Sequence, residues 1–137
     1  MNKKEDRVAC DHLGIFTQDP ERLIRFYTQK MGFDREKDSL IPRSVIEPIF
    51  GIADDCRLIR LALKNLKLEL FSPLKASLKK PCNRTAGYNH FGLSTGSRDD
   101  FCRKLRRKKV KIIAVKRNSH KVYFVKDPDG NLIEIRD

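Results

Sequence analysis

Apolar and polar residues alternate along several short segments of the chain, and this period of two predicts β-strands. The predicted strands cover residues 8–16, 58–63, 66–71, 88–95, 110–115, 121–125 and 132–136. A tight turn at Lys64-Asn65 connects the second strand to the third. The sequence Asp127-Pro128-Asp129-Gly130 predicts a turn before the last strand, because glycine accepts the positive φ that such a turn needs.

Two other segments have apolar residues at the three- to four-residue spacing of an amphipathic helix. The first begins at Asp19-Pro20, a capping residue followed by proline at the first helical position, and it ends near Gly32. The second covers residues 97–109, where Ser97 and Asp100 match a capping box. Residues 34–57 mix charged residues with prolines, and we predict a long loop there with room for one strand.

The order of these elements occurs twice. The stretch DHLGIFT at 11–17 opens the first half and NHFGLST at 89–95 opens the second, while LEL at 68–70 and IEI at 133–135 close them. Such internal similarity indicates a duplicated unit, here strand, helix and three strands. We therefore predict an α+β fold in one domain, residues 1–137, with two βαβββ modules at about 7–72 and 88–137 and a linker at 73–87.

Strand alternation assigns a face to the polar residues of this repeat. Because successive side chains point to opposite faces of a strand, His12 lies opposite Leu13 and Ile15, and His90 has the same relation to its apolar neighbours. Glu69 and Glu134 lie between pairs of large aliphatic residues in the closing strands. The apolar faces are expected under the helices, so both histidines and both glutamates are expected on the other face.

Two imidazoles and two carboxylates on matching faces suggest a metal site. His12, Glu69, His90 and Glu134 can converge if the two modules pack around a pseudo-twofold axis. Such a donor set suits one divalent ion, either Zn, Ni, Co, Mn or Fe. Taken singly, each residue has an ordinary explanation as a surface or solvated side chain. The repeat carries the prediction, and we assign no residue to any other cofactor.

The composition limits the partners of the protein. The net charge is +12, which favours an acidic small molecule or a nucleic acid. The densest basic run, residues 103–109, falls in the last turns of the second predicted helix, where the helix dipole favours cations, so we interpret it as a solvated face and expect no nucleic-acid partner. Without an apolar run of membrane length or a secretory signal, we expect a cytoplasmic protein with reduced cysteines and no membrane partner.

Four stretches of the chain resemble the vicinal oxygen chelate superfamily: DHLGIFTQDPERLIRFYTQKMGF, LKLELF, NHFGLST and VYFVKDPDGNLIEI. This superfamily includes glyoxalase I, methylmalonyl-CoA epimerase, extradiol dioxygenases and bleomycin- or fosfomycin-resistance proteins. The resemblance implies a half-open, cup-shaped mixed sheet with helices on its outer face and a divalent metal inside. It also implies that His12, Glu69, His90 and Glu134 are the ligands, a set most similar to that of glyoxalase I.

The resemblance implies a metal-dependent lyase or isomerase that chelates vicinal oxygens of a small, acidic substrate, with glutathione and coenzyme A conjugates as candidates. Glu69 or Glu134 would transfer a proton, and residues 34–57 would form a lid or specificity loop. The alternatives are an epimerase, a dioxygenase or a non-catalytic ligand-binding protein of the resistance type. The epimerase usually has Gln at the position of Glu69, and Glu47 is a loose candidate for its second carboxylate. Since small members of the superfamily are often homodimers, we expect a homodimer.

Overall fold

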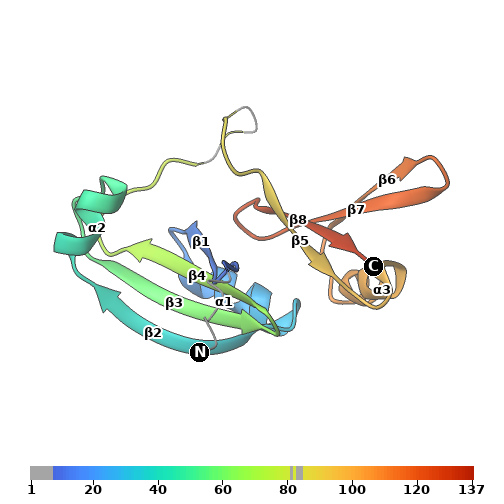
Figure 1. Ribbon diagram of the computed structural model, residues 1–137, viewed down its shortest axis with the longest axis horizontal. Helices are drawn as coiled ribbons and strands as arrows, with labels where there is room; N and C mark the ends of the chain where they lie inside the picture. The colour runs from blue at the N-terminus through green and yellow to red at the C-terminus, as the bar shows by residue number, and fades with distance from the viewer. Residues whose placement is uncertain (1–7, 81, 83–84) are drawn as a thin grey trace, which may run out of the picture.

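The computed structural model describes residues 8–80, 82 and 85–137 (Figure 1). Its elements are β1 (Leu13–Phe16), α1 (Pro20–Gln29), β2 (Asp34–Ile41), α2 (Arg43–Phe50), β3 (Cys56–Leu63), β4 (Leu66–Pro73), β5 (His90–Ser94), α3 (Arg98–Arg107), β6 (Ile112–Arg117), β7 (His120–Lys126) and β8 (Leu132–Arg136). Within these described residues, no helix has the length and apolar character needed to cross a bilayer.

Each half of the chain forms a four-stranded mixed sheet. The strand order is β1-β4-β3-β2 in the first sheet and β5-β8-β7-β6 in the second. In both sheets the first strand of the module runs parallel to the last one, and the remaining neighbours are antiparallel. The two sheets lie side by side (Figure 1). The predicted α+β fold of two βαβββ modules is confirmed.

The prediction of a long loop at residues 34–57 is wrong in part, because the one strand it allowed is present as β2 but the segment also contains helix α2. The sequence of β2, DREKDSLI, has almost no apolar alternation, since it is the outer strand of its sheet and most of its side chains are exposed. Backbone pairing with β3 and an ion pair of 2.6 Å between Asp38 and Arg57 hold it in place. Helix α2 follows Pro42 and ends at Gly51, whose φ of 70° is left-handed.

The helices cover one face of each sheet, as the apolar alternation predicts. Leu23 and Tyr27 of α1 are buried against Leu68 and Leu70 of β4, and α3 packs in the same way on β8. Both predicted helix caps form, with Asp19 accepting a hydrogen bond from the backbone N–H of Arg22 and Ser97 accepting one from Asp100. The opposite face of each sheet carries the His and Gly residues that recur at the same spacing in both modules. We call this face the cup face.

A buried latch fixes the two modules relative to each other. The Tyr27 hydroxyl on α1 donates to Asp127 Oδ2 in the β7–β8 turn at 2.8 Å. Beside it, Thr17 Oγ1 and Arg22 Nη2 donate to Asp129 at 2.7 and 2.8 Å. Asp127 is only 4% exposed, and burial raises the pKa of its carboxyl although hydrogen bonds oppose this effect. The apolar side chains under both sheets form one continuous core around this latch.

Candidate metal centre

The first module presents a His–Glu pair on its cup face. His12 Nε2 lies 3.6 Å from Glu69 Oε2. The other ring nitrogen, Nδ1, donates a hydrogen bond of 2.8 Å to the Asp11 carboxylate. This hydrogen bond keeps the pKa of Asp11 below its usual value. A proton held on Nδ1 leaves the lone pair of Nε2 directed toward Glu69.

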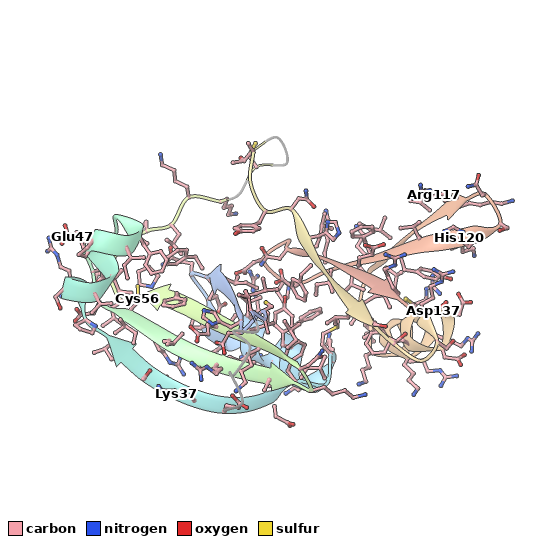
Figure 2. The ribbon with its side chains drawn as sticks, in the orientation of Figure 1. Lys37, Glu47, Cys56, Arg117, His120 and Asp137 are labelled. Carbon is pink, nitrogen blue, oxygen red and sulfur yellow. The ribbon has the colours of Figure 1, made fainter. Side chains whose placement is uncertain are left out.

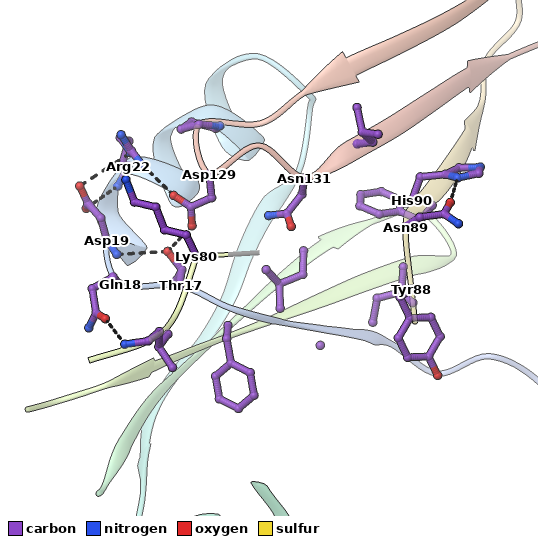
Figure 3. A pocket seen from close by; sticks show the side chains of 18 of the residues that line it. Thr17, Gln18, Asp19, Arg22, Lys80, Tyr88, Asn89, His90, Asp129 and Asn131 are labelled. Atoms are coloured by element: carbon purple, nitrogen blue, oxygen red, sulfur yellow. Dashed lines mark hydrogen bonds and ion pairs between the residues drawn. The ribbon is translucent and has the colours of Figure 1, made fainter. Parts of the chain in front are cut away.

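The second module repeats this arrangement with different neighbours. His90 Nε2 lies 3.4 Å from Glu134 Oε2, and His90 Nδ1 is hydrogen-bonded to the side-chain oxygen of Asn89 (Figure 3). The imidazole also meets the edge of Phe124, with ring centroids 5.1 Å apart. Both modules therefore fix the same histidine tautomer through the residue that precedes the histidine.

The geometry of each pair fits two ligands of one metal ion. Metal–nitrogen and metal–oxygen bonds of about 2.1 Å place neighbouring ligand atoms roughly 3.0–3.5 Å apart at tetrahedral or octahedral angles. The observed separations of 3.6 and 3.4 Å lie close to this range and exceed that of a good hydrogen bond. A neutral imidazole with its second nitrogen held by a carboxylate or amide oxygen is also the usual form of a histidine ligand.

The two pairs do not meet within one chain. Among the residues that the structure describes, no three His, Cys, Asp or Glu side chains come close enough together to hold a metal. His12 and His90 instead both line a cleft of about 910 Å³ between the two modules, with His90 labelled in Figure 3. His12 directly precedes β1 and His90 is the first residue of β5, and each of these strands is an edge strand of its sheet. A single chain thus offers two half-sites, each with one imidazole and one carboxylate.

The two glutamates have different surroundings. Glu69 is 6% exposed, and Arg60 Nη2 donates to its Oε1 at 2.8 Å, an interaction that raises the pKa of Arg60. The side chain of Glu134 is 24% exposed, and the Nε of Arg136 lies 3.9 Å from it. One carboxylate oxygen of Glu69 is therefore held by Arg60, whereas the carboxylate of Glu134 is more accessible and less tightly held.

Sequence reasoning did not identify Asp11, Asn89 or Arg60 as parts of the site. A signal existed for the first two, because an oxygen-bearing side chain precedes the histidine in both DHLGIFT and NHFGLST. Arg60 reaches Glu69 because the two residues are paired across β3 and β4, a register that the sequence does not state. The loose candidate Glu47 lies in the middle of α2, where it forms an ion pair with Arg43 at 2.6 Å (Figure 2).

Comparison with known proteins agrees with this architecture. The structure superposes on trypanothione-dependent glyoxalase I of Leishmania major with a TM-score of 0.71 and 22% identity, covering 96% of this chain and 87% of the other. A glyoxalase family protein from Bacillus cereus gives 0.72 and 15%, with 97% and 95% covered. The antibiotic-binding protein TnmS3 of a Streptomyces species gives 0.65 and 20%, with 96% of each chain covered.

These superpositions establish a common fold. No curated protein matches the sequence significantly. The sequence model of one family, however, matches residues 9–135, nearly the whole chain. The chain belongs to the Glyoxalase/Bleomycin resistance protein/Dioxygenase superfamily.

Proposed function

We propose that the protein is a divalent-metal-dependent lyase or isomerase of the glyoxalase I type. The observation that carries this proposal is the duplicated His–Glu pair, His12 with Glu69 and His90 with Glu134, in which each histidine directs Nε2 toward its carboxylate. Four such ligands would hold one ion of Zn, Ni, Co, Mn or Fe. When bound, the ion would act as a Lewis acid on two neighbouring oxygens of a small substrate.

The complete site requires two copies of the chain. The latch between Tyr27 and Asp127 and the shared core hold the two modules of one chain with their half-sites apart. In a twofold dimer, the first module of one chain would face the second module of its partner, because an isologous arrangement brings both unlike surfaces together twice. Such a homodimer would contain two sites, each with His12 and Glu69 from one chain and His90 and Glu134 from the other.

The residues of the chain divide the chemistry between them. A carboxylate takes the proton from the carbon beside a substrate carbonyl and returns it to the neighbouring carbon, so the net reaction is an isomerisation. We assign this role to Glu134, because it is more exposed than Glu69 and because its ion pair with Arg136, at 3.9 Å, is longer than the 2.8 Å hydrogen bond from Arg60 to Glu69. Glu69, held by Arg60, keeps a fixed position as a ligand.

Metal titration and turnover test this proposal. The purified protein should bind about one ion of Ni, Co, Mn or Zn per chain in calorimetry, with a higher melting temperature, and His12→Ala should weaken binding at least tenfold. With a glutathione hemithioacetal, methylmalonyl-CoA and a catechol as substrates, Glu134→Gln should lower kcat more than Glu69→Gln does. A protein that binds none of these metals, or an unchanged rate in the double Gln variant, would contradict the enzyme assignment.

A ligand-binding protein without catalysis is the second candidate. It is favoured by the fold shared with an antibiotic-binding protein. Metal-independent binding of a ligand without turnover would support this candidate. We also propose a cytoplasmic location, where the buried thiols of Cys56 and Cys102, whose pKa values are raised by burial, would stay reduced.

A further inference from the structure

Three phenylalanine rings form a cluster on the cup face of the first module. They come from three elements: Phe16 from β1, Phe71 from β4 and Phe50 from the end of α2. The ring centroids lie 5.1 Å apart for Phe16 and Phe50, 5.5 Å for Phe50 and Phe71, and 5.9 Å for Phe16 and Phe71. The edge-to-face packing of the first pair, at 89°, is a favourable aromatic geometry.

The register of the strands places this cluster beside the first half-site. Phe16 is paired with Phe71, and Gly14 is paired with Glu69, two residues earlier on the same two strands. Two residues of a strand span about 7 Å, so the rings begin about 7 Å from the carboxylate on the same face. A substrate chelated at the metal would therefore extend directly over the rings.

The cluster remains open although it is apolar. Phe16 is 38% exposed and Phe50 is 41% exposed. Gly14 has no side chain beside the Phe71 ring, where a Cβ atom would fit at 3.9 Å, so this position leaves room for a ligand atom. Phe16 also borders the cleft between the modules, together with Lys79 and Lys80. An open aromatic surface with basic neighbours suits a flat, apolar ligand that carries an acidic group.

The second half-site has a ring of its own. Phe124 is paired with Glu134 across β7 and β8 and contacts the imidazole of His90. In the proposed dimer this ring would belong to the other wall of the same cup. Aromatic side chains thus accompany the ligands in both modules, which favours a ligand ring between them over a second protein surface.

We propose that Phe16, Phe50 and Phe71 bind an aromatic ring of the substrate, which is therefore an aryl compound with vicinal oxygens, such as an aryl-substituted hydroxy or keto acid. This inference rests on the metal-centred function proposed above and names its substrate class. It distinguishes the protein from an enzyme whose substrate is recognised through a peptide or nucleotide group.

Binding of mandelate and lactate tests the inference, because the two acids share their vicinal oxygens and differ by a phenyl in place of a methyl group. Calorimetry on the whole dimer, with the metal and after its removal by EDTA, should show mandelate binding about ten- to fiftyfold more tightly, since the ring adds roughly 100 Å² of buried apolar surface. The metal should strengthen the binding of both acids. It should leave their ratio nearly unchanged.

Variants locate the effect. Phe16→Ala should reduce the ratio to about threefold or less while lactate binding stays the same. Gly14→Ala should also reduce it, because the added methyl fits beside Phe71 without a clash and occupies the space above the ring. Leu40→Ala, at an exposed apolar residue of the outer strand β2, serves as the control and should leave the ratio intact.

The inference and the proposed function fail separately. Equal affinities for the two acids, or no measurable binding of mandelate, would overturn the aromatic site whether or not a metal binds. A preference for mandelate that persists while no metal binds would support the aromatic site and overturn the metal-dependent function.

Discussion

The orientation of each candidate histidine depends on the residue before it in the sequence. Asp11 and Asn89 differ in charge, yet both present an oxygen to Nδ1 of the following histidine. A carboxylate holds the Nδ1 proton more firmly than an amide oxygen does, so His12 is expected to be the stronger metal ligand of the two. The small difference between the twin phrases DHLGIFT and NHFGLST thus has a chemical consequence.

At this scale we predict that Asp11→Ala and Asn89→Ala each weaken metal binding by about ten- to a hundredfold, with little change in the stability of the metal-free protein. Each substitution releases the imidazole from its fixed tautomer while keeping all four ligands. Calorimetric titration with Ni or Zn measures the change in metal affinity. Asp34→Ala, at an exposed carboxylate of β2, is the matched control. Unchanged affinity in both variants would show that the preceding residues do not support the ligands.

At the scale of elements, the sequence predicted those parts whose pattern reflects burial. Leu68 and Leu70 alternate with Glu69 because one face of β4 lies under α1, and the same holds for β8 under α3. β2 was predicted only as one strand somewhere within residues 34–57, because its stability comes from backbone pairing and ion pairs, which leave no apolar period. The four candidate ligands were found from the repeat, but their separation into two half-sites depends on how the modules pack, and this packing is decided by long-range contacts such as Tyr27 with Asp127.

For helix α1 we predict that Asp19→Ala lowers the free energy of unfolding by about 1 kcal/mol, because the Arg22 backbone N–H loses its capping acceptor. Asp19→Asn keeps an acceptor oxygen at the cap and should cost clearly less. Urea denaturation followed by circular dichroism compares the two. An equal loss in both variants would assign the effect to the charge of Asp19 instead of its capping hydrogen bond.

At the scale of the whole molecule, the latch makes the stability of the fold sensitive to pH. Burial raises the folded pKa of Asp127 above its usual value of 3.8. Between these two pKa values the folded chain binds more protons than the unfolded chain, so the free energy of unfolding falls as the pH rises through this window. Hydrogen bonds from Tyr27 and Asn131 stabilise the carboxylate of Asp127 in this buried position.

We predict that Asp127→Asn removes this contribution. The stability advantage of the natural chain over the variant should be largest near pH 4 and should shrink as the pH rises through the folded pKa of Asp127. Parallel urea titrations at several pH values measure the difference, in which the groups common to both chains cancel. A difference that stays constant or grows with pH would contradict the raised pKa.

The proposed assembly of two half-sites from two chains into one centre makes a prediction that no single-chain site shares. One variant, His12→Ala with Glu69→Gln, inactivates the first module, and a second variant, His90→Ala with Glu134→Gln, inactivates the second. Neither variant alone should bind metal in the four-ligand site. After unfolding and refolding together, half of the dimers should be mixed, and each mixed dimer should regain one intact site, so about one quarter of the natural metal-binding capacity should return.

The same mixture should regain about one quarter of any turnover, whereas a site within one chain would stay inactive because every chain in the mixture carries a damaged module. Equal amounts of each variant refolded alone provide the control for refolding itself. Mass analysis of the refolded sample shows whether mixed dimers have formed. Mixed dimers without metal binding would therefore place the two half-sites in separate centres and contradict the shared one.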